Sequence, residues 1–311
     1  MREEHPPNVI QGPWGRETEP SRLLDRLDIP LHQPIELAVW AKKPRGLRCR
    51  LLPGQEPITF KKVRREVEGE ILTVAASKVW QHRNTVYMSG DIIDCRLDVG
   101  ALGLQPLGLT EMGEWLPESE LELEDTNGPF GSYLKPILAR GPCREFQMEQ
   151  AIPGFDPDAC DDDPIVRASE ARHFGDWDTA YRIMAELLSD DLRCLDAHAH
   201  LGNWSFNASD EPHPIYESEA RRHYEAGVRI GELSLGDNFD HVLPWALINN
   251  RPFLRCLHGY GLCLWRAGEV DAARSVFERM LRLNPSDDQA VCPLLADIDS
   301  GRSWYHAWGE Q

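Results

Sequence analysis

The sequence lacks any long apolar run. No stretch of the 311 residues approaches the length of about 20 consecutive apolar residues that a membrane-spanning helix needs. Its first residues, MREEHPPN, contain no apolar core of the kind found in secretory signals. We therefore expect a soluble, cytoplasmic protein without a membrane partner. The length predicts about two domains and allows a sizeable core.

Common catalytic signatures are also missing. The chain has no GxSxG elbow, no phosphate-cradling GxxxxGK[ST] loop, no GxGxxG after a predicted strand and no HExxH. We therefore predict a protein that is not an enzyme and that binds no cofactor. A catalytic pair assembled from distant positions leaves no such motif, so this alternative stays open.

Motifs for metals and disulfides are absent in the same way. None of the 8 cysteines forms a CxxC pair, and most lie within apolar patterns, so we expect reduced, buried thiols. The pair His198 and His200 resembles the HxH of metal-dependent hydrolases. We expect a helix at this position, where residues i and i+2 point about 200° apart and cannot share one ion. No metal site is predicted.

Lysine is scarce and unevenly placed. The net charge is −18, yet residues 35–100 contain twelve Lys and Arg against eight Asp and Glu. Five of the six lysines lie between Lys42 and Lys78. The overall charge argues against wrapping nucleic acid with the whole surface, because such binding requires neutralised phosphates. A local basic region in the first third of the chain is compatible with it.

Two short amphipathic helices are the clearest feature that is present. Between Arg251 and Pro285, small or apolar residues follow helical spacing on both sides of Gly268, which suits a helix end because it tolerates the left-handed conformation. Small residues at Gly261 and Ala273 allow the two helices to pack closely. Pro285 ends the second helix, since proline has no backbone N–H to donate.

This segment resembles a tetratricopeptide repeat (TPR), a 34-residue helix pair. The resemblance depends on the following residues: Tyr260, Gly261, Gly268, Ala273, Phe277 and Pro285. Weaker versions of the pattern occur in residues 161–194 and, with an insertion, around 201–227, so three stacked helix pairs are expected. A capping helix over residues 287–299, with Ser286 as its N-cap, would follow.

Before residue 110 the apolar residues follow the two-residue period of strands and not the period of helices. Leu47, Cys49 and Leu51 alternate with Arg48 and Arg50, which is typical of a half-buried strand. Further strand-like runs occupy residues 35–41, 58–63, 70–75, 85–88 and 95–99. We predict a small antiparallel β barrel or sandwich, of SH3 or OB type, over residues 35–110.

The complete expectation is an α+β chain of four parts. Residues 1–34, rich in proline, form an irregular arm, and the β domain follows. Residues 111–163, acidic and rich in proline and glycine, form a connector, and residues 164–311 form the TPR-like helical domain with its capping helix. The whole resembles bacterial proteins that join an N-terminal β domain to C-terminal tetratricopeptide repeats; the resemblance implies no reaction.

Because the first helix of each TPR pair lines a concave groove, the resemblance implies a set of partner-contacting positions. They comprise Arg172, His173, Asn203, Asn207, Arg255, His258, Trp265 and Arg266, with Ala199, Phe206 and Leu262 at neighbouring offsets. Guanidinium, amide and aromatic groups together suit a polypeptide that offers carboxylates and an apolar anchor. The function predicted first is therefore an adaptor or scaffold that binds a protein or peptide in the groove. Nothing in the sequence predicts an oligomeric state.

The alternative function uses the β domain. Basic and aromatic residues that could hold a nucleic acid are Lys61, Lys62, Arg64, Arg65, Lys78, Trp80 and Arg83, with Tyr87 beside them. In this interpretation the protein is a nucleic-acid-associated regulator whose repeats recruit a protein. Solvated lysines and packed aromatics would produce the same pattern, so the sequence leaves the choice open.

Overall fold

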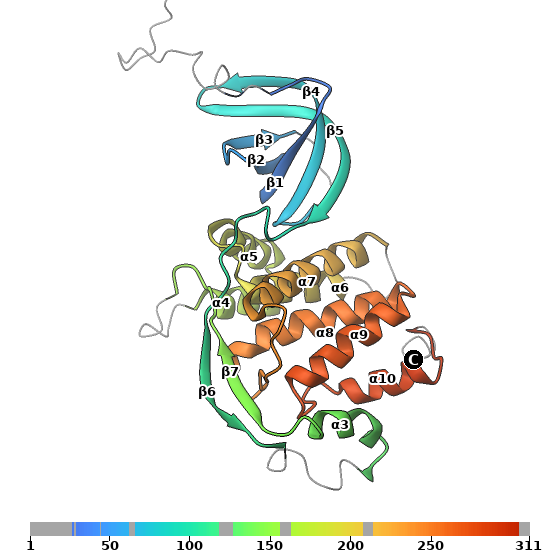
Figure 1. Cartoon of the computed structure of the whole chain (residues 1–311). Helices are drawn as coiled ribbons and strands as arrows, with labels where there is room; N and C mark the ends of the chain where they lie inside the picture. Colours follow the sequence, from blue (N-terminus) through green and yellow to red (C-terminus); the bar gives the residue numbers. More distant parts are fainter. Residues whose placement is uncertain are drawn as a thin grey trace, which may run out of the picture.

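The computed structural model describes residue 27 and residues 29–43, 45–61, 66–117, 127–155, 163–207 and 214–304, with the side chains of 214–217 left out. It has a β barrel at one end, a helical region next to it, and a two-stranded ribbon that runs beside the helices (Figure 1). The predicted α+β class is confirmed. Among the described residues, no helix combines the length and apolar character needed to cross a bilayer.

The barrel is closed by five strands in the order β1-β2-β3-β5-β4. Their bounds are β1 (Pro34–Lys43), β2 (Gly46–Leu52), β3 (Pro57–Phe60), β4 (Glu70–His82) and β5 (Thr85–Leu97). All neighbours pair in antiparallel fashion except β3 and β5, which are parallel. The alternation in β2 behaves as predicted, because Leu47 and Cys49 are buried inside the barrel while Arg48 is exposed.

The region expected to be a connector contains regular structure. Strands β6 (Leu109–Trp115) and β7 (Cys143–Met148) pair in antiparallel fashion, and helix α3 (Gly131–Leu138) lies between them in sequence. The acidic residues Glu111 and Glu114 are exposed, whereas Trp115 and Met148 are buried in the core of the helical region. These two acidic side chains thus lie on the solvated part of a strand, and the acidic residues between 118 and 126 and between 156 and 162 lie outside the described residues.

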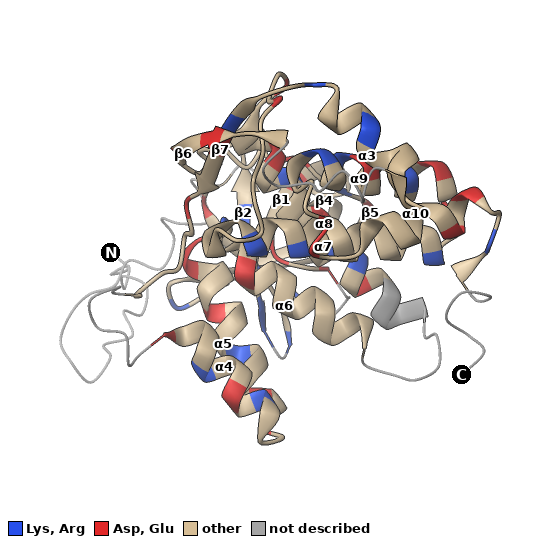
Figure 2. Cartoon of the chain, turned by 90° about the horizontal axis from the view of Figure 1, so that it is seen from below, with Lys and Arg blue, Asp and Glu red and all other residues tan. Residues whose placement is uncertain are grey.

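From residue 164 onward, the described α-helices form three consecutive pairs and a final helix, with the short 3-10 helix η3 (Ile248–Asn250) before the third pair. These are α4 (Pro164–His173) with α5 (Trp177–Asp190), α6 (Leu195–Phe206) with α7 (Pro214–Leu235), α8 (Arg251–Arg266) with α9 (Val270–Leu283), and α10 (Val291–Asp299). Figure 2 shows basic and acidic residues interspersed along α4 and α5. The solvated faces of this first pair therefore carry both charge signs.

Glycines set the turn and the close packing of the third pair. Gly268 has φ +80°, a conformation that disfavours residues with a Cβ, and it joins α8 to α9. A Cβ built on Gly261 would lie 2.5 Å from the Phe277 ring, so α8 and α9 approach each other closely only because this residue is glycine. Ala273 is fully buried in the same interface.

The last helix begins differently from the prediction. Ser286 was expected as N-cap, but the carboxylate of Asp287 accepts hydrogen bonds from the backbone N–H groups of Val291 and Cys292. Asp287 reaches these groups because it has φ +52° and Ala290 is also left-handed. The carboxylate therefore satisfies donors at the start of α10 that a Ser286 cap was predicted to satisfy.

The barrel and the helices are joined by polar and apolar contacts. Trp40 Nε1 of β1 donates a hydrogen bond to the Ser189 carbonyl oxygen of α5 at 2.6 Å. Lys42 pairs with Glu219 of α7, and Arg222 Nε lies 3.4 Å from Oε1 of the buried Glu70. An apolar cluster beside them includes Ala38, Ile71, Leu102 and Leu192. These contacts fix the position of the barrel relative to α5 and α7.

Candidate partner-binding groove

A cavity of about 500 Å³ lies between α6 and α8. It is lined by four of the residues that the repeat offsets predicted, namely Asn203, Asn207, Arg255 and His258. Ala199, Phe206 and Leu262, at the neighbouring predicted offsets, also line it. The structure therefore brings together the predicted positions of the second and third helix pairs.

Helical spacing explains why these side chains converge. On α8, Arg255, His258 and Leu262 follow each other by three and four residues, so they share one face. Gly259 on that face lets the Tyr224 ring of α7 approach, since a Cβ on Gly259 would lie 2.2 Å from the ring. The absence of a side chain at Gly259 and the inserted Tyr224 ring together shape the floor of the cavity.

The two asparagines form a linked amide pair at one edge. Asn207 Nδ2 donates to Asn203 Oδ1 at 2.7 Å and to the Asn203 carbonyl oxygen at 2.8 Å. Since Asn207 Nδ2 is used in this pair, Asn207 Oδ1 remains as an acceptor and Asn203 Nδ2 as a donor for a ligand. A peptide group has one donor and one acceptor, so it can bind to both.

Arg255 is the charged residue of the cavity. Its Nη1 lies 3.4 Å from Oδ1 of Asp196, and its guanidinium lies 5.6 Å from the centre of the Trp245 ring. Burial raises the pKa of Asp196 to about 6, while the positive charge of Arg255 acts in the opposite direction. The contact to Asp196 uses one of the five N–H donors of a guanidinium and leaves others for a partner carboxylate.

The histidines of the cavity are neutral near pH 7. Burial lowers the pKa of His258 to about 4. The pKa of His200 is also lowered to about 4, first by burial and then by the positive charges of Arg255 and Arg172. Arg255, paired with Asp196, is therefore the side chain of the cavity lining that is charged near pH 7.

The predicted residues of the first helix pair lie outside this cavity. Arg172, on α4, places its guanidinium 4.8 Å from the Trp177 ring centre and 5.3 Å from that of Trp204. His173 is exposed and contacts Phe174 edge-on. Neither residue is part of the cavity lining.

The prediction that Trp265 contacts a partner is wrong. Trp265 is only 1% exposed, its Nε1 donates to the Arg302 carbonyl oxygen at 3.3 Å, and its ring packs edge-on against Trp304. The face of α8 that carries Trp265 is covered by the chain that follows α10. Arg266, the next residue of α8, has its guanidinium 5.2 Å from the Phe206 ring centre.

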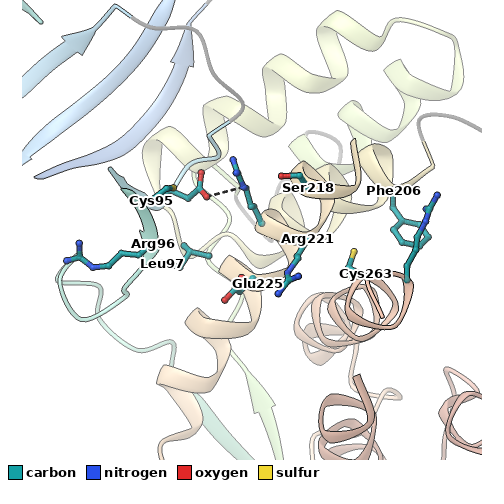
Figure 3. Close-up of a pocket in the computed structure, with 12 residues that line it drawn as sticks. Cys95, Arg96, Leu97, Phe206, Ser218, Arg221, Glu225 and Cys263 are labelled. Carbon is teal, nitrogen blue, oxygen red and sulfur yellow. Dashed lines mark ion pairs between the residues drawn. The ribbon is translucent and has the colours of Figure 1, made fainter. Parts of the chain in front are cut away.

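A second cavity, of about 610 Å³, lies at the junction of barrel and helices. Arg266 and Phe206 are among its lining residues. Figure 3 shows Cys95 and Leu97 on one side of it, opposite Arg221 and Glu225. Its arginines include three with carboxylate partners: Arg96 pairs with Glu36, Arg221 with Glu269 and Arg222 with Glu70. Burial and the nearby Glu70 raise the pKa of Cys95, so its thiol stays protonated. This junction is an ion-pair network with no activated nucleophile at Cys95.

Four residues of the groove were missed by the offset argument: His200, Tyr224, Gly259 and Gln289. His200 follows Asp196 by four residues, and this spacing could have placed it near Arg255. Tyr224 and Gln289 come from α7 and from the loop before α10, and only the tertiary arrangement brings them to the cavity.

The structure describes some of the basic residues predicted on the β domain. Lys61 Nζ lies 4.9 Å from the Tyr87 ring centre and Lys78 Nζ lies 5.4 Å from that of Trp80. Arg83 is exposed in the turn between β4 and β5. Lys62, Arg64 and Arg65 lie outside the described residues.

Comparison with known proteins supports one part of this arrangement. The profile of the tetratricopeptide repeat family matches residues 254–298, which cover most of α8, all of α9 and nearly all of α10. Searches among curated proteins and among solved structures gave no match. The C-terminal helices that carry Arg255, His258 and Leu262 are therefore similar to a tetratricopeptide repeat, as their sequence predicted.

Proposed function

We propose that this protein is a non-catalytic cytoplasmic adaptor that binds a segment of a partner protein in the groove between α6 and α8. The observation that carries the proposal is the convergence of Asn203, Asn207, Arg255 and His258 on one cavity. The similarity of residues 254–298 to a tetratricopeptide repeat supports it, since such repeats commonly mediate contacts between proteins.

The side chains of the groove define the expected partner segment. A carboxylate of the partner pairs with the remaining N–H groups of Arg255, whose guanidinium is positioned by Trp245 and Asp196. The amide pair of Asn203 and Asn207 binds a backbone peptide group. An apolar side chain of the partner contacts Leu262 and Tyr224. The partner segment is therefore extended and acidic, with one apolar anchor.

The proposal is tested by affinity purification with matched variants. Arg255→Glu reverses the charge in the groove, and Arg182→Glu makes the same change on α5, where Arg182 pairs only loosely with Glu186 at 3.4 Å. We expect the partner to be captured by the wild type and by Arg182→Glu but lost with Arg255→Glu, while circular dichroism shows all three folded. Equal capture by the three proteins would contradict the proposal.

The captured protein must also have the stated chemistry. Peptides that tile the partner sequence should bind the purified protein only where an acidic residue lies near a large apolar one. Replacing that acidic residue by its amide should weaken binding by about tenfold, the effect of losing one charge-assisted pair of about 1.5 kcal/mol. Binding that ignores the acidic residue would contradict the assignment of Arg255.

A further inference from the structure

The outer face of the barrel carries an ordered row of basic and aromatic side chains. The strand register places Arg48 of β2 opposite Thr59 of β3, Thr59 opposite Tyr87 of β5, and Tyr87 opposite Trp80 of β4. These four residues therefore form one continuous row across four strands. Its members face outward, because their sequence neighbours Ile58, Phe60, Val86 and Met88 fill the barrel interior.

Two lysines flank the aromatic part of this row. The rings of Trp80 and Tyr87 are stacked, with centroids 5.6 Å apart and planes inclined by 15°. Lys78 lies two residues before Trp80 on the same face, opposite Ser89, and Lys61 follows the end of β3. Their ammonium groups lie 5.4 Å from the Trp80 ring centre and 4.9 Å from the Tyr87 ring centre.

Acidic residues on the β4–β5 hairpin lie away from its exposed turn. Glu70, Asp91 and Asp94 lie, together with Arg96, in the part of the hairpin that is nearer the helices in Figure 1. Lys78 and Arg83 lie in the part that ends in the turn. In the described row and its two flanking lysines there is no acidic residue. Asp91 lies on the same face of β5, two residues after Ser89, and the Glu56 carboxylate of the β2–β3 turn lies beside Gly54. The face is therefore locally positive in a chain of net charge −18.

We propose that this face, defined by Arg48, Lys61, Lys78, Trp80 and Tyr87, binds single-stranded nucleic acid. Arg48, Lys61 and Lys78 pair with successive phosphates, and the half-buried Trp80 and Tyr87 rings offer a rigid surface on which a base stacks. Such stacking does not depend on the identity of the base, because every base has a π face. The inference goes beyond the adaptor function and does not depend on the groove, which lies on other elements.

An acidic polypeptide is the competing ligand, because it would satisfy the same three cations. An acidic polypeptide does not carry a planar ring on every residue, so it would gain nothing from the stacked rings of Trp80 and Tyr87. These rings therefore distinguish nucleic acid from an acidic polypeptide, and the test must separate their contribution to binding from that of the charges.

The experiment measures fluorescence anisotropy of labelled dT12 and U12 with the full chain at several salt concentrations. Three variants are compared with the wild type: Lys61→Gln combined with Lys78→Gln, Trp80→Leu, and Lys135→Gln on the exposed side of α3 as a control. Polyglutamate serves as the competitor. Circular dichroism melts confirm that each variant is folded, and Tyr87→Leu replaces Trp80→Leu if that variant unfolds.

We expect at least one of the two oligonucleotides to bind, with Trp80→Leu weakening binding by about tenfold. The double lysine variant should lower the slope of log affinity against log salt by about 1.4, since each phosphate contact contributes about 0.7 for single strands. Lys135→Gln should behave as the wild type. No binding of either strand, equal binding of polyglutamate, or no effect of the aromatic substitution would overturn the proposal.

Discussion

Asn250 ties the helical region to strand β7 through Met148. Its Oδ1 accepts a hydrogen bond from the backbone N–H of Met148 at 2.8 Å, while its Nδ2 donates to the carbonyl oxygens of Phe146 at 2.9 Å and Pro244 at 3.0 Å. Asn250 is fully buried. One side chain at the start of α8 therefore satisfies three backbone groups from two other segments and positions the helix that carries Arg255.

Replacing Asn250 by alanine should destabilise the protein strongly. Buried backbone groups would lose their partners, and each such loss costs about 1–3 kcal/mol, so we expect the free energy of unfolding to fall by about 2–4 kcal/mol. Urea denaturation measures it, with Asn249→Ala on the partly exposed neighbour as control. A change below about 0.5 kcal/mol for Asn250→Ala, the range of neutral surface substitutions, would contradict this role.

The close packing of α7 against α8 depends on Gly259 and predicts a coupled pair of substitutions. A Cβ at Gly259 would lie 2.2 Å from the Tyr224 ring, so Gly259→Ala should cost about 1–3 kcal/mol through overpacking. In a Tyr224→Ala background the same change should cost much less, because the ring is absent. A double-mutant cycle measures the coupling. Additive costs would show that the Gly259 effect does not arise from contact with Tyr224.

Two buried histidines next to the barrel make stability depend on pH. His198 and His223 lie with their Nδ1 atoms 3.4 Å apart, and His198 Nε2 contacts the Leu192 carbonyl oxygen. Burial lowers the pKa of His198 to about 4 and that of His223 well below its usual value, the latter also through Lys42, His198 and Arg222.

The direction in which stability changes with pH follows from how many protons the folded and unfolded chains bind. Between pH 6.5 and pH 4 the unfolded chain binds protons at these histidines and the folded chain does not, so unfolding becomes easier as the pH falls. Asp196, with its pKa of about 6, acts in the opposite direction. We expect His223→Phe to reduce the acid-induced loss of stability, measured by urea denaturation at pH 7 and pH 5. An NMR titration of His198 with a midpoint near 6.5 would contradict the assignment.

The pair formed by Arg255 and Asp196 gives a prediction about the groove itself. Because Arg255 opposes the rise that burial causes in the pKa of Asp196, Arg255→Leu should raise that pKa above about 6. Carbon-13 NMR of the Asp196 carboxyl measures it, with Arg274→Leu on α9 as a distant control. An unchanged titration would mean that the 3.4 Å contact does not persist in solution.

Local patterns predicted the elements that depend on local spacing. The small residues Gly261 and Ala273 and the turn at Gly268 were enough to predict α8 and α9, because helix pairing there depends on contacts within one repeat. In the barrel, β4 extends to His82, beyond the predicted run that ended at residue 75, and β5 joins the predicted runs 85–88 and 95–99 into one strand that ends at Leu97. The polar residues after Ala75 and Met88 hid these extensions, since both faces of the hairpin become partly solvated.

The candidate site was predictable only in part. Repeat offsets placed Asn203, Arg255 and His258 correctly on one cavity, because all three lie on the first helices of adjacent pairs. The same offsets failed for Trp265, since they could not show that the chain near Trp304 covers that face of α8. The contribution of Gln289 depends on a loop far along the chain, which periodicity does not locate.

The most direct test of the groove as a binding site is site-specific photo-crosslinking in cells. A benzophenone side chain at Asn203, which is exposed at the cavity, is compared with one at Val166, which is exposed on α4 away from it. We predict that the probe at Asn203 captures one partner polypeptide at an acidic segment, that Arg255→Glu abolishes this capture, and that the probe at Val166 does not capture it. Capture of the same polypeptide from both positions, or capture at Asn203 that persists with Arg255→Glu, would contradict the account.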